Sequence, residues 1–363
     1  MKIVIDLRMY GPSFGIGRYN QKLLEELVKI DQDNQYVLLF KEAPENLNLP
    51  NNFKIQIVDC HWYGLKEQIV LPAILREINP DLVHFPHFNV PILYRGKFVV
   101  TIHDLIMTKF PSRRASTLSK FGFKFKYGMY EKVIKHAIKR AQRVIAVSDF
   151  TAQDIKKYFK LNETQANKIK VVYEGVTVSN GQANPDIKLP NKFFIYVGNA
   201  YPHKNLEWLI EVFKLFLEKH PSYHLILVGK KDYFYNRLVK KFASIPNLIF
   251  PGFVSDKDLA SYYKSAKAYI FPSKYEGFGL PPLEAMVHKL PVLSSNSGPM
   301  PEVLGKAAKY FNPDDREKLL CLMSEIIEDE KLRDSLIQAG QEQIKKYSWS
   351  KMAREILEIY NKQ

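Results

Sequence analysis

Short apolar runs alternate with longer amphipathic stretches along almost the whole chain, which predicts strands followed by helices. In the first half the predicted strands are residues 2–6, 36–40, 54–58, 81–85, 98–102 and 143–147. In the second half they are residues 193–197, 224–228, 248–250, 268–271, 291–293 and 308–311. The runs are rich in Val, Ile and Phe without strict alternation, as is typical of strands buried on both faces of a parallel sheet. The pattern therefore predicts two βαβ arrays.

A polar stretch at residues 179–191 contains Gly, Pro and Asn and separates the two arrays as a linker would. We therefore predict an α/β protein with two Rossmann-like domains, an N-terminal one over residues 1–180 and a C-terminal one over residues 190–347. A length of 363 residues agrees with two domains of about 150 residues each. Because ligands of parallel sheets bind beyond the carboxyl ends of the strands, we expect the two sheets to face each other across a cleft.

One predicted helix in the first domain shows its period clearly. Apolar residues recur there at steps of three and four, and they are Tyr130, Val133, Ile134, Ala137, Ile138 and Ala141. We expect this face to turn inward. The basic side chains between these positions should then turn outward, and they are Lys132, Lys135, Lys139 and Arg140.

Charge raises the question of partners. The chain carries 53 Lys and Arg against 38 Asp and Glu, a formal net charge of +15. Residues 109–143 hold eleven Lys and Arg side chains and a single acid, Glu131, together with several aromatic residues. Such a basic stretch is either a solvated face or a surface that docks on an anionic membrane. We expect no nucleic-acid partner, because no RNA- or DNA-binding module is recognised in the sequence.

Composition excludes several classes of protein. With 46% hydrophobic and 25% charged residues, the chain is not disordered. No apolar run reaches the ~18–20 residues that cross a bilayer, and Asp6 and Arg8 come too early for a signal peptide. Cys60 and Cys321 lie far apart without a CxxC pair, so neither a disulfide scaffold nor a zinc site is expected. We therefore expect a cytoplasmic protein, with a peripheral position on the inner face of the membrane as the alternative.

Glycines follow the first predicted strand. Gly11, Gly15 and Gly17 stand between that strand and a helical pattern, where exposed amides can approach phosphates or sugar hydroxyls. Asn20 takes the place of the third glycine of a dinucleotide-binding fingerprint, so that motif is excluded. A ligand loop and a tight structural turn both remain open.

Histidines mark the ends of two other strands in the first half. His103 and Asp104 follow strand 98–102, where a histidine can bond a substrate hydroxyl and an aspartate can orient it. A histidine that caps the next segment is the alternative. His84 and His87 have a similar place at the end of strand 81–85. Because no third ligand accompanies them, we interpret them as cleft-lining residues and not as a metal site.

In the second half, Gly198 and Asn199 follow strand 193–197, and Lys204 stands just before a helical pattern. An ammonium group beside helix-terminal amides suits a diphosphate clamp, and a solvated lysine is the alternative of equal weight.

Two carboxylates stand eight residues apart later in the same half. Glu276 lies on a turn with Gly277 and Gly279, close to where a sugar would lie, and Glu284 falls in the opening turns of a helix, from which it could reach a ribose. The start of that helix favours anions. A cap at Glu276 and a solvated Glu284 would explain neither the glycines nor the spacing.

Together these motifs resemble the retaining glycosyltransferases of family 4, which have the two-domain fold called GT-B. The resemblance covers the whole chain, with the motifs in the family's order at strand ends. It rests on the glycine loop after the first strand, His103-Asp104, the segment from Gly198 to Lys204, Glu276 with Glu284, and Pro301-Glu302-Val303. The ending from residue 347 onward is similar to the family's terminal helix, which implies that residues 348–363 cross back onto the N-terminal domain.

The resemblance implies a role for each site residue. The catalytic group is His103 and Glu276 at the donor sugar and Lys204 at its diphosphate. The donor-binding group is Gly15, Gly17, Gly198, Asn199, Lys204, Phe278, Gly279, Leu280 and Glu284, the last of these on the ribose. The acceptor-binding group is His84, His87 and Asp104. Many members of the family have arginine where Asn199 stands, so one cation at the diphosphate is lost unless Arg18 or His203 replaces it.

The implied reaction moves a hexosyl unit from a nucleotide sugar, with GDP-mannose expected first, to a glycan or lipid-linked acceptor in the synthesis of cell-surface polysaccharide or glycoconjugate. A UDP- or dTDP-sugar donor, epimerisation of a nucleotide sugar, and a phosphorylase with pyridoxal phosphate are the alternatives. No cofactor or metal is expected, because no DxD motif follows a strand and Asp314-Asp315 is typical of a helix start.

Overall fold

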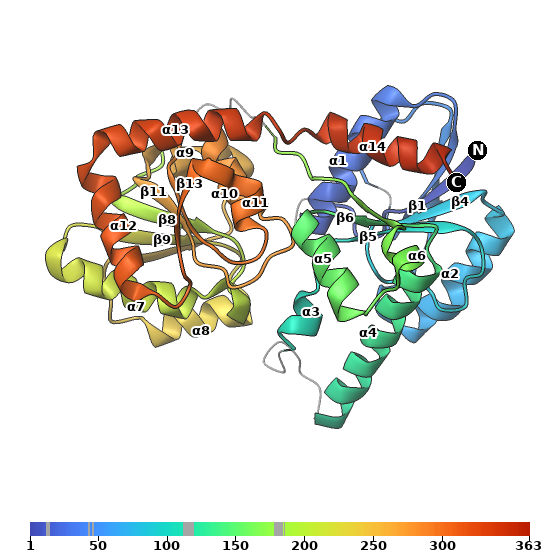
Figure 1. Cartoon of the computed structure of the whole chain (residues 1–363), viewed down its shortest axis with the longest axis horizontal. Coiled ribbons are helices and arrows are strands. Elements are labelled where there is room, and N and C mark those ends of the chain that lie inside the picture. Colours follow the sequence, from blue (N-terminus) through green and yellow to red (C-terminus); the bar gives the residue numbers. More distant parts are fainter. Residues whose placement is uncertain (12–14, 43, 46, 112–119, 178–183, 185) are drawn as a thin grey trace. The chain divides into compact units, whose positions relative to one another are not determined.

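The computed structural model (Figure 1) describes residues 1–11, 15–42, 44–45, 47–111, 120–177, 184 and 186–363, with the backbone alone at residues 120, 121 and 123. The chain divides into two compact units. The first, the N-terminal unit, consists of Met1–Gly175 and Ser348–Gln363, and the second, the C-terminal unit, of Val176–Tyr347.

The N-terminal unit is built on a parallel sheet with the strand order β3-β2-β1-β4-β5-β6-β7. Its strands are β1 (Lys2–Asp6), β2 (Gln35–Phe40), β3 (Phe53–Ile57), β4 (Leu82–Phe85), β5 (Phe98–Ile102), β6 (Arg143–Ala146) and β7 (Ile169–Val171). Its helices are α1 (Gly15–Ile30), α2 (Leu65–Ile78), α3 (Ile106–Lys109), α4 (Lys120–Arg140), α5 (Asp149–Tyr158), α6 (Glu163–Ala166) and α14 (Trp349–Asn361).

Burial along these strands explains their composition. Every residue of β4 and β5 is buried, whereas four of the five residues of the edge strand β3 are exposed. The six strands predicted for this half are confirmed to within a residue at each end. The prediction missed β7, because Ile169 and Val171 flank an exposed lysine and form no apolar run.

Helix α4 carries its apolar residues on one face. Tyr130, Ile134, Ala137 and Ile138 are buried, whereas Lys132, Lys135, Lys139 and Arg140 are exposed. The predicted orientation of this helix is therefore confirmed. Residues 112–119 of the basic stretch lie outside the described residues.

The last helix belongs to the first unit. Helix α14 packs against α1 (Figure 1) and buries Trp349, Met352 and Tyr360 among other residues. Gly175 also allows the chain to pass close to the start of α14, because a Cβ added there would lie 2.2 Å from the backbone nitrogen of Trp349.

The C-terminal unit has a second parallel sheet, with the strand order β10-β9-β8-β11-β12-β13. Its strands are β8 (Phe193–Val197), β9 (His224–Val228), β10 (Leu248–Gly252), β11 (Ala268–Phe271), β12 (Val292–Ser295) and β13 (Ala308–Phe311). Its helices are η2 (Pro202–Lys204), α7 (Leu206–Lys219), α8 (Tyr233–Lys241), α9 (Asp256–Ser265), α10 (Leu280–Val287), α11 (Met300–Leu304), η3 (Gly305–Ala307), α12 (Arg316–Glu328) and α13 (Glu330–Ile344). All six predicted strands are present, with ends shifted by up to two residues. The linker predicted at 179–191 lies partly outside the described residues.

Candidate functional site

In the C-terminal unit, the predicted site residues gather beyond two neighbouring strands. Strands β8 and β11 pair in parallel near the middle of the sheet, so their carboxyl ends lie at the same edge. Lys204 ends the short helix η2 after β8, and Glu276 lies in the loop after β11. This edge is where ligands of such sheets bind.

Lys204 and Glu276 form an ion pair across these two loops. The Lys204 Nζ donates to Oε1 of Glu276 at 2.6 Å and to Oε2 at 2.8 Å. Their side chains are only 12% and 9% exposed. The ammonium also lies 5.7 Å from the centre of the Phe271 ring, within the range of a cation–π contact. Sequence reasoning placed the two residues in separate roles, and the structure brings them into direct contact.

His203 adds no charge beside this pair. Its side chain is buried, and burial lowers its pKa to about 4, with a further lowering from the Lys204 charge and an opposing effect of Glu276. The imidazole is therefore neutral at pH 7. The predicted replacement of the missing diphosphate cation by His203 stays a prediction.

Three buried tyrosines donate hydrogen bonds to the turn after β8. The hydroxyl of Tyr269 donates to the carbonyl of Val197, that of Tyr235 to the carbonyl of Gly198, and that of Tyr196 to the carbonyl of Asn199. The distances between these oxygens are 3.1, 2.8 and 2.8 Å. Three successive carbonyls are thus held by side chains of the core, which restricts the backbone that carries Gly198 and Asn199.

Sequence reasoning missed these tyrosines because each one reads as an ordinary apolar position. Tyr196 and Tyr269 lie inside predicted strands, and Tyr235 lies on α8. The signal that could have found them is chemical, since a buried tyrosine hydroxyl normally has a hydrogen-bond partner.

Two glycines of this site have backbone conformations that other residues avoid. Gly198 has a φ of 150° and Gly279 a φ of 95°, both in the positive region that strains residues with a Cβ. At Gly279 an added Cβ would also lie 2.3 Å from the Cε atom of Met300. Gly279 caps helix α10 and so sets where its amino end begins.

Helix α10 carries the remaining residues predicted for the donor. Leu280 is its first residue, prolines follow at its start, and Glu284 lies half-buried one turn further on. The ring of Phe278 is buried and contacts the ring of Tyr347 edge to face at 5.4 Å. Any contact of Phe278 with a ligand would therefore come from its backbone.

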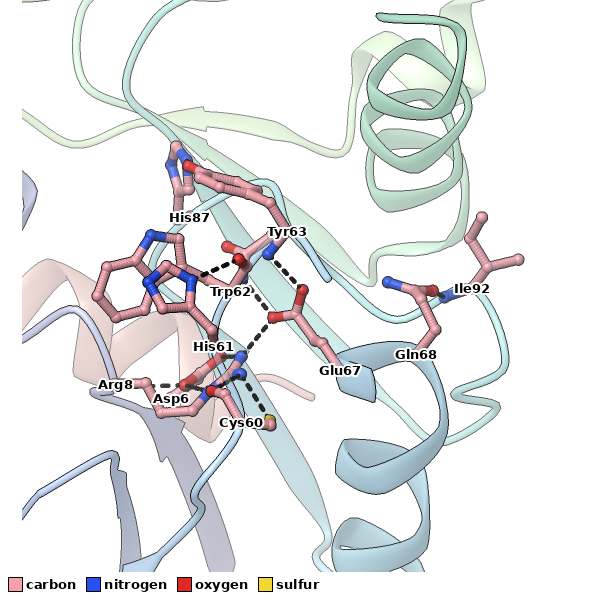
Figure 2. A network of polar contacts seen from close by, with 11 residues as sticks. Asp6, Arg8, Cys60, His61, Trp62, Tyr63, Glu67, Gln68, His87 and Ile92 are labelled. Atoms are coloured by element: carbon pink, nitrogen blue, oxygen red, sulfur yellow. Dashed lines mark hydrogen bonds and ion pairs between the residues drawn. The ribbon is translucent and has the colours of Figure 1, made fainter. Parts of the chain in front are cut away.

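The N-terminal unit also buries charged residues at a strand end (Figure 2). Arg8 donates to Asp6 Oδ2 at 2.6 Å and to Glu67 Oε1 of α2 at 2.6 Å, and all three side chains are less than 10% exposed. Its Nη1 further contacts the carbonyl and Sγ of Cys60. Burial raises the pKa of Glu67, and the charge of Arg8 opposes that effect. This network, which we name the Arg8 cluster (Asp6, Arg8 and Glu67), was not predicted.

His103 and Asp104 are engaged within the same unit. The Nδ1 of His103 lies 3.1 Å from Glu174 Oε1, and its Nε2 lies 2.9 Å from the carbonyl of Pro86. Asp104 accepts a hydrogen bond from the amide of Ile106, the first residue of the short helix α3, at 2.8 Å. The predicted roles of His103 and Asp104 toward substrate stay predictions, and Glu174 is a partner that the sequence did not indicate.

His84 is a correction to the predicted cleft-lining residues. Its side chain has no exposed surface, its Nδ1 bonds the Tyr360 hydroxyl at 2.5 Å, and its Nε2 bonds the Thr101 hydroxyl at 2.9 Å. Burial lowers its pKa to about 3. His84 therefore ties β4 to α14 inside the core and offers no nitrogen to an acceptor.

His87 differs from His84. It is half-buried, and its Nε2 lies 2.6 Å from the hydroxyl of Tyr63.

Helix α1 begins at Gly15 of the glycine loop, and a Cβ added at Gly17 would lie 2.1 Å from the carbonyl oxygen of Gly11. Residues 12–14 of the glycine loop lie outside the described residues.

The described residues contain neither a metal-binding cluster nor a membrane-spanning helix. Across those residues, no group of three or more His, Cys, Asp or Glu side chains has the geometry to hold a metal ion. In the same part of the chain, no helix combines the length and apolar character needed to span a bilayer.

The chain matches two family models in succession. Residues 15–180 match the model described as Glycosyltransferase Family 4. Residues 180–343 match the model described as Glycosyl transferases group 1.

Individual proteins are similar over most of their length. The O-antigen chain mannosyltransferase B of Escherichia coli is 27% identical, with 96% of both chains covered. The O-antigen chain mannosyltransferase RfbU of Salmonella typhimurium is 31% identical, over 70% of this chain and 67% of that protein. Among solved structures, Alr3699/HepE of Anabaena in complex with UDP and glucose superposes with a TM-score of 0.75, at 17% identity and full coverage of both chains.

Proposed function

The chain belongs to the glycosyltransferases of family 4, and we propose that it transfers mannose from GDP-mannose, with retention of the anomeric configuration, to a glycan or lipid-linked acceptor. The names of the two O-antigen mannosyltransferases support mannose as the sugar and surface polysaccharide as the product. A UDP- or dTDP-sugar donor is the alternative, and a nucleotide-sugar epimerase is the alternative reaction.

The observation that carries the proposal is the ion pair of Lys204 and Glu276 beyond β8 and β11. In our proposal, the donor diphosphate takes over Lys204, which then leaves the carboxylate of Glu276 facing the transferred sugar. Glu284, one turn into α10, binds the ribose hydroxyls. The amides of Phe278, Gly279 and Leu280 at the start of that helix bind the sugar or the phosphates, since helix starts favour anions.

The charges of these groups suit the reaction. Breaking the bond between the anomeric carbon and the diphosphate oxygen leaves positive charge on the sugar and negative charge on the leaving group. In the proposal, Glu276 meets the former, and Lys204 with the start of α10 meets the latter. Retention follows either from attack on the same face, with the leaving phosphate taking the acceptor's proton, or from a covalent intermediate.

We further propose that no metal ion takes part, because Lys204 and the helix start already provide positive charge at the leaving group. Transfer by the full chain should then persist in EDTA. Loss of activity in the chelator, restored by Mg²⁺ or Mn²⁺, would overturn this part of the proposal.

A donor screen tests the proposal as a whole. The purified chain is incubated without acceptor with GDP-mannose, UDP-glucose and a dTDP-sugar, and the slow release of free sugar is followed by NMR. We expect hydrolysis of GDP-mannose, with the α-anomer released first. Faster hydrolysis of another nucleotide sugar would show that the donor is not GDP-mannose. Formation of an epimerised nucleotide sugar would show that the reaction is epimerisation and not transfer.

For location, we propose that α4 docks on an anionic membrane from one side. Its residues Lys124 and Lys126 are exposed, Phe125 between them is 70% exposed, and Lys132, Lys135 and Lys139 are exposed further along the helix. Each basic residue near such a surface contributes about 1 kcal/mol. The chain should bind anionic but not neutral vesicles and be released by salt, and replacement of Lys124 and Lys126 by Glu should weaken binding. Equal binding to both vesicle types would refute the docking surface.

A further inference from the structure

A small pocket opens beside the Arg8 cluster at the carboxyl ends of β1 and β4. The residues that matter among its lining are Asp6, Arg8, Asn20, Trp62, His87 and Asn89. Its volume of about 10 Å³ has room for a single water-sized group. Trp62 and His87 are half-buried, whereas Asn20 is only 1% exposed.

The charged residues of this pocket form hydrogen bonds with one another and with their neighbours. The Nε and Nη2 atoms of Arg8 donate to the two oxygens of Asp6, and Nη2 also donates to Glu67. The side-chain amide of Asn89 donates to the same Glu67 oxygen at 2.8 Å. These bonds hold this side of the pocket in place, and Figure 2 shows those of the Arg8 cluster.

Two other polar atoms in the lining are buried without such bonds. Within the part of the chain that the structure describes, neither Oδ1 of Asn20 nor Nδ1 of His87 has a hydrogen-bond partner. A buried polar atom left unpaired costs about 1–3 kcal/mol, so a protein that keeps two of them at one pocket gains from a ligand that pairs them.

The state of His87 decides which ligand fits. Burial, with a smaller effect of His103, lowers the pKa of His87 well below its usual value, so the ring is neutral at pH 7. A phenol keeps its proton at pH 7, so the hydroxyl of Tyr63 can donate to Nε2 of His87. In the tautomer that accepts this hydrogen bond, the ring proton of His87 resides on Nδ1. The pocket presents one N–H donor and one carbonyl acceptor, and a hydroxyl group, which accepts one hydrogen bond and donates another, satisfies both.

We propose that this pocket, which we name the hydroxyl socket (Asn20, Trp62 and His87), binds one hydroxyl group of the acceptor sugar and thereby selects the acceptor. The hydroxyl oxygen accepts from Nδ1 of His87 and donates to Oδ1 of Asn20, while the indole of Trp62 at the rim covers an apolar face of the sugar ring. The inference rests on the proposed function and adds to it the residues that recognise the acceptor. Of the residues predicted for the acceptor, it retains His87 and adds Asn20 and Trp62.

The experiment uses the full chain with GDP-mannose as donor and octyl α-mannoside as the acceptor probe. Asn20→Ala and His87→Ala should each raise the acceptor KM about tenfold, which is the loss expected for one buried hydrogen bond to an unpaired partner. The donor KM should change much less. His87→Asn places an amide N–H close to where Nδ1 lies and should recover most of the loss. His224→Ala is the matched control, because its Nδ1 is also buried and without a partner but lies on β9 of the other unit.

Monodeoxy analogues of the mannoside identify the bound hydroxyl in the unmodified chain. One analogue should lose about tenfold in KM, and that loss should vanish in Asn20→Ala because the interaction is already gone. If every analogue loses the same factor in both proteins, the socket holds only water and the inference fails. It also fails if both alanine variants behave as His224→Ala does.

Binding without donor separates this inference from the proposed function. Saturation-transfer NMR detects octyl α-mannoside on the chain in the absence of any nucleotide sugar. A chain that neither hydrolyses nor transfers any donor refutes the proposed function, and weaker mannoside binding by Asn20→Ala would still support the socket. Equal binding by the unmodified chain and Asn20→Ala refutes the socket, whatever the donor screen shows.

Discussion

Each unit holds an ion cluster at the carboxyl end of a central strand, and the two clusters differ in how they use their hydrogen bonds. In the N-terminal unit, Arg8 is bound by two carboxylates and by the carbonyl and thiol of Cys60. In the C-terminal unit, Lys204 makes both of its strong contacts to the single carboxylate of Glu276. The first cluster joins a strand end to helix α2, and the second joins two loops.

The difference teaches that burial and charge alone do not mark a ligand site. The Arg8 cluster satisfies itself from several directions, so a ligand could enter only by breaking a network of buried bonds. The Lys204–Glu276 pair has one opposing charge, which a diphosphate can replace at Lys204, and the carboxylate released from the lysine then faces the transferred sugar. We therefore interpret the Arg8 cluster as scaffold and the pair as reactive.

The largest effect should come from breaking the scaffold. Arg8→Met leaves Asp6 and Glu67 buried without their cation, which should lower the free energy of unfolding by about 3–5 kcal/mol. Calorimetry of the full chain measures this as a lower melting temperature of the N-terminal unit. Arg354→Met is the control, because Arg354 lies exposed on α14 and bonds only the neighbouring Ser350 side chain among the contacts described. Similar small losses in both variants would mean that the Arg8 cluster is not structural.

The reactive pair should respond in turnover instead. Lys204→Ala removes a charge aimed at the leaving diphosphate, so kcat should fall about 100- to 1,000-fold, as for the loss of a major transition-state contact. Lys274→Ala, in the same loop as Glu276 but paired with the exposed Asp314, is the matched control and should keep its activity. A Lys204 variant with nearly full kcat would remove the basis of the comparison.

The two carboxylates of the C-terminal unit should separate in kinetics. Glu284→Ala removes a contact to the ribose that is alike in ground and transition states, so the donor KM should rise about tenfold with little change in kcat. Glu276→Ala should mainly lower kcat, because its contact to the sugar strengthens as charge develops. Steady-state kinetics with varied donor measures both, and an unaltered donor KM in Glu284→Ala would contradict the ribose assignment.

The smallest effect should come from changes to the tyrosines that donate hydrogen bonds to the turn after β8. Tyr196→Phe removes the hydroxyl that binds the Asn199 carbonyl, at a cost of about 1 kcal/mol in stability, and should raise the donor KM severalfold because the turn is less restricted. Tyr130→Phe, which removes a buried hydroxyl bound to Thr108 in the other unit, should cost similar stability with no change in donor KM. If both variants change the donor KM equally, the tyrosines do not position the turn.

Much of the fold was predictable because it depends on local pattern. Buried strands such as β5 are continuous apolar runs, and α4 repeats its apolar residues at the helical period. Each of these elements can therefore be predicted from a short segment of sequence. The short strand β7 escaped because its two apolar residues become a strand only when β6 supplies hydrogen bonds. The histidines could not be told apart from the sequence either. His84 and His87 both lie at the end of β4, but His84 is fully buried and His87 is half-buried.

The sequence by itself determined which residues end each strand and which chemical groups they carry, because strand ends follow from hydrophobicity along the chain. Only the tertiary structure decided which of those groups meet. It paired Lys204 with Glu276 and closed Arg8 between Asp6 and Glu67. At one pocket it left Oδ1 of Asn20 and Nδ1 of His87 without a hydrogen-bond partner among the described residues. The physical reason is that a side chain's electrostatics and hydrogen bonds depend on distances of a few ångströms between residues far apart in sequence, and packing of the sheets and helices sets those distances.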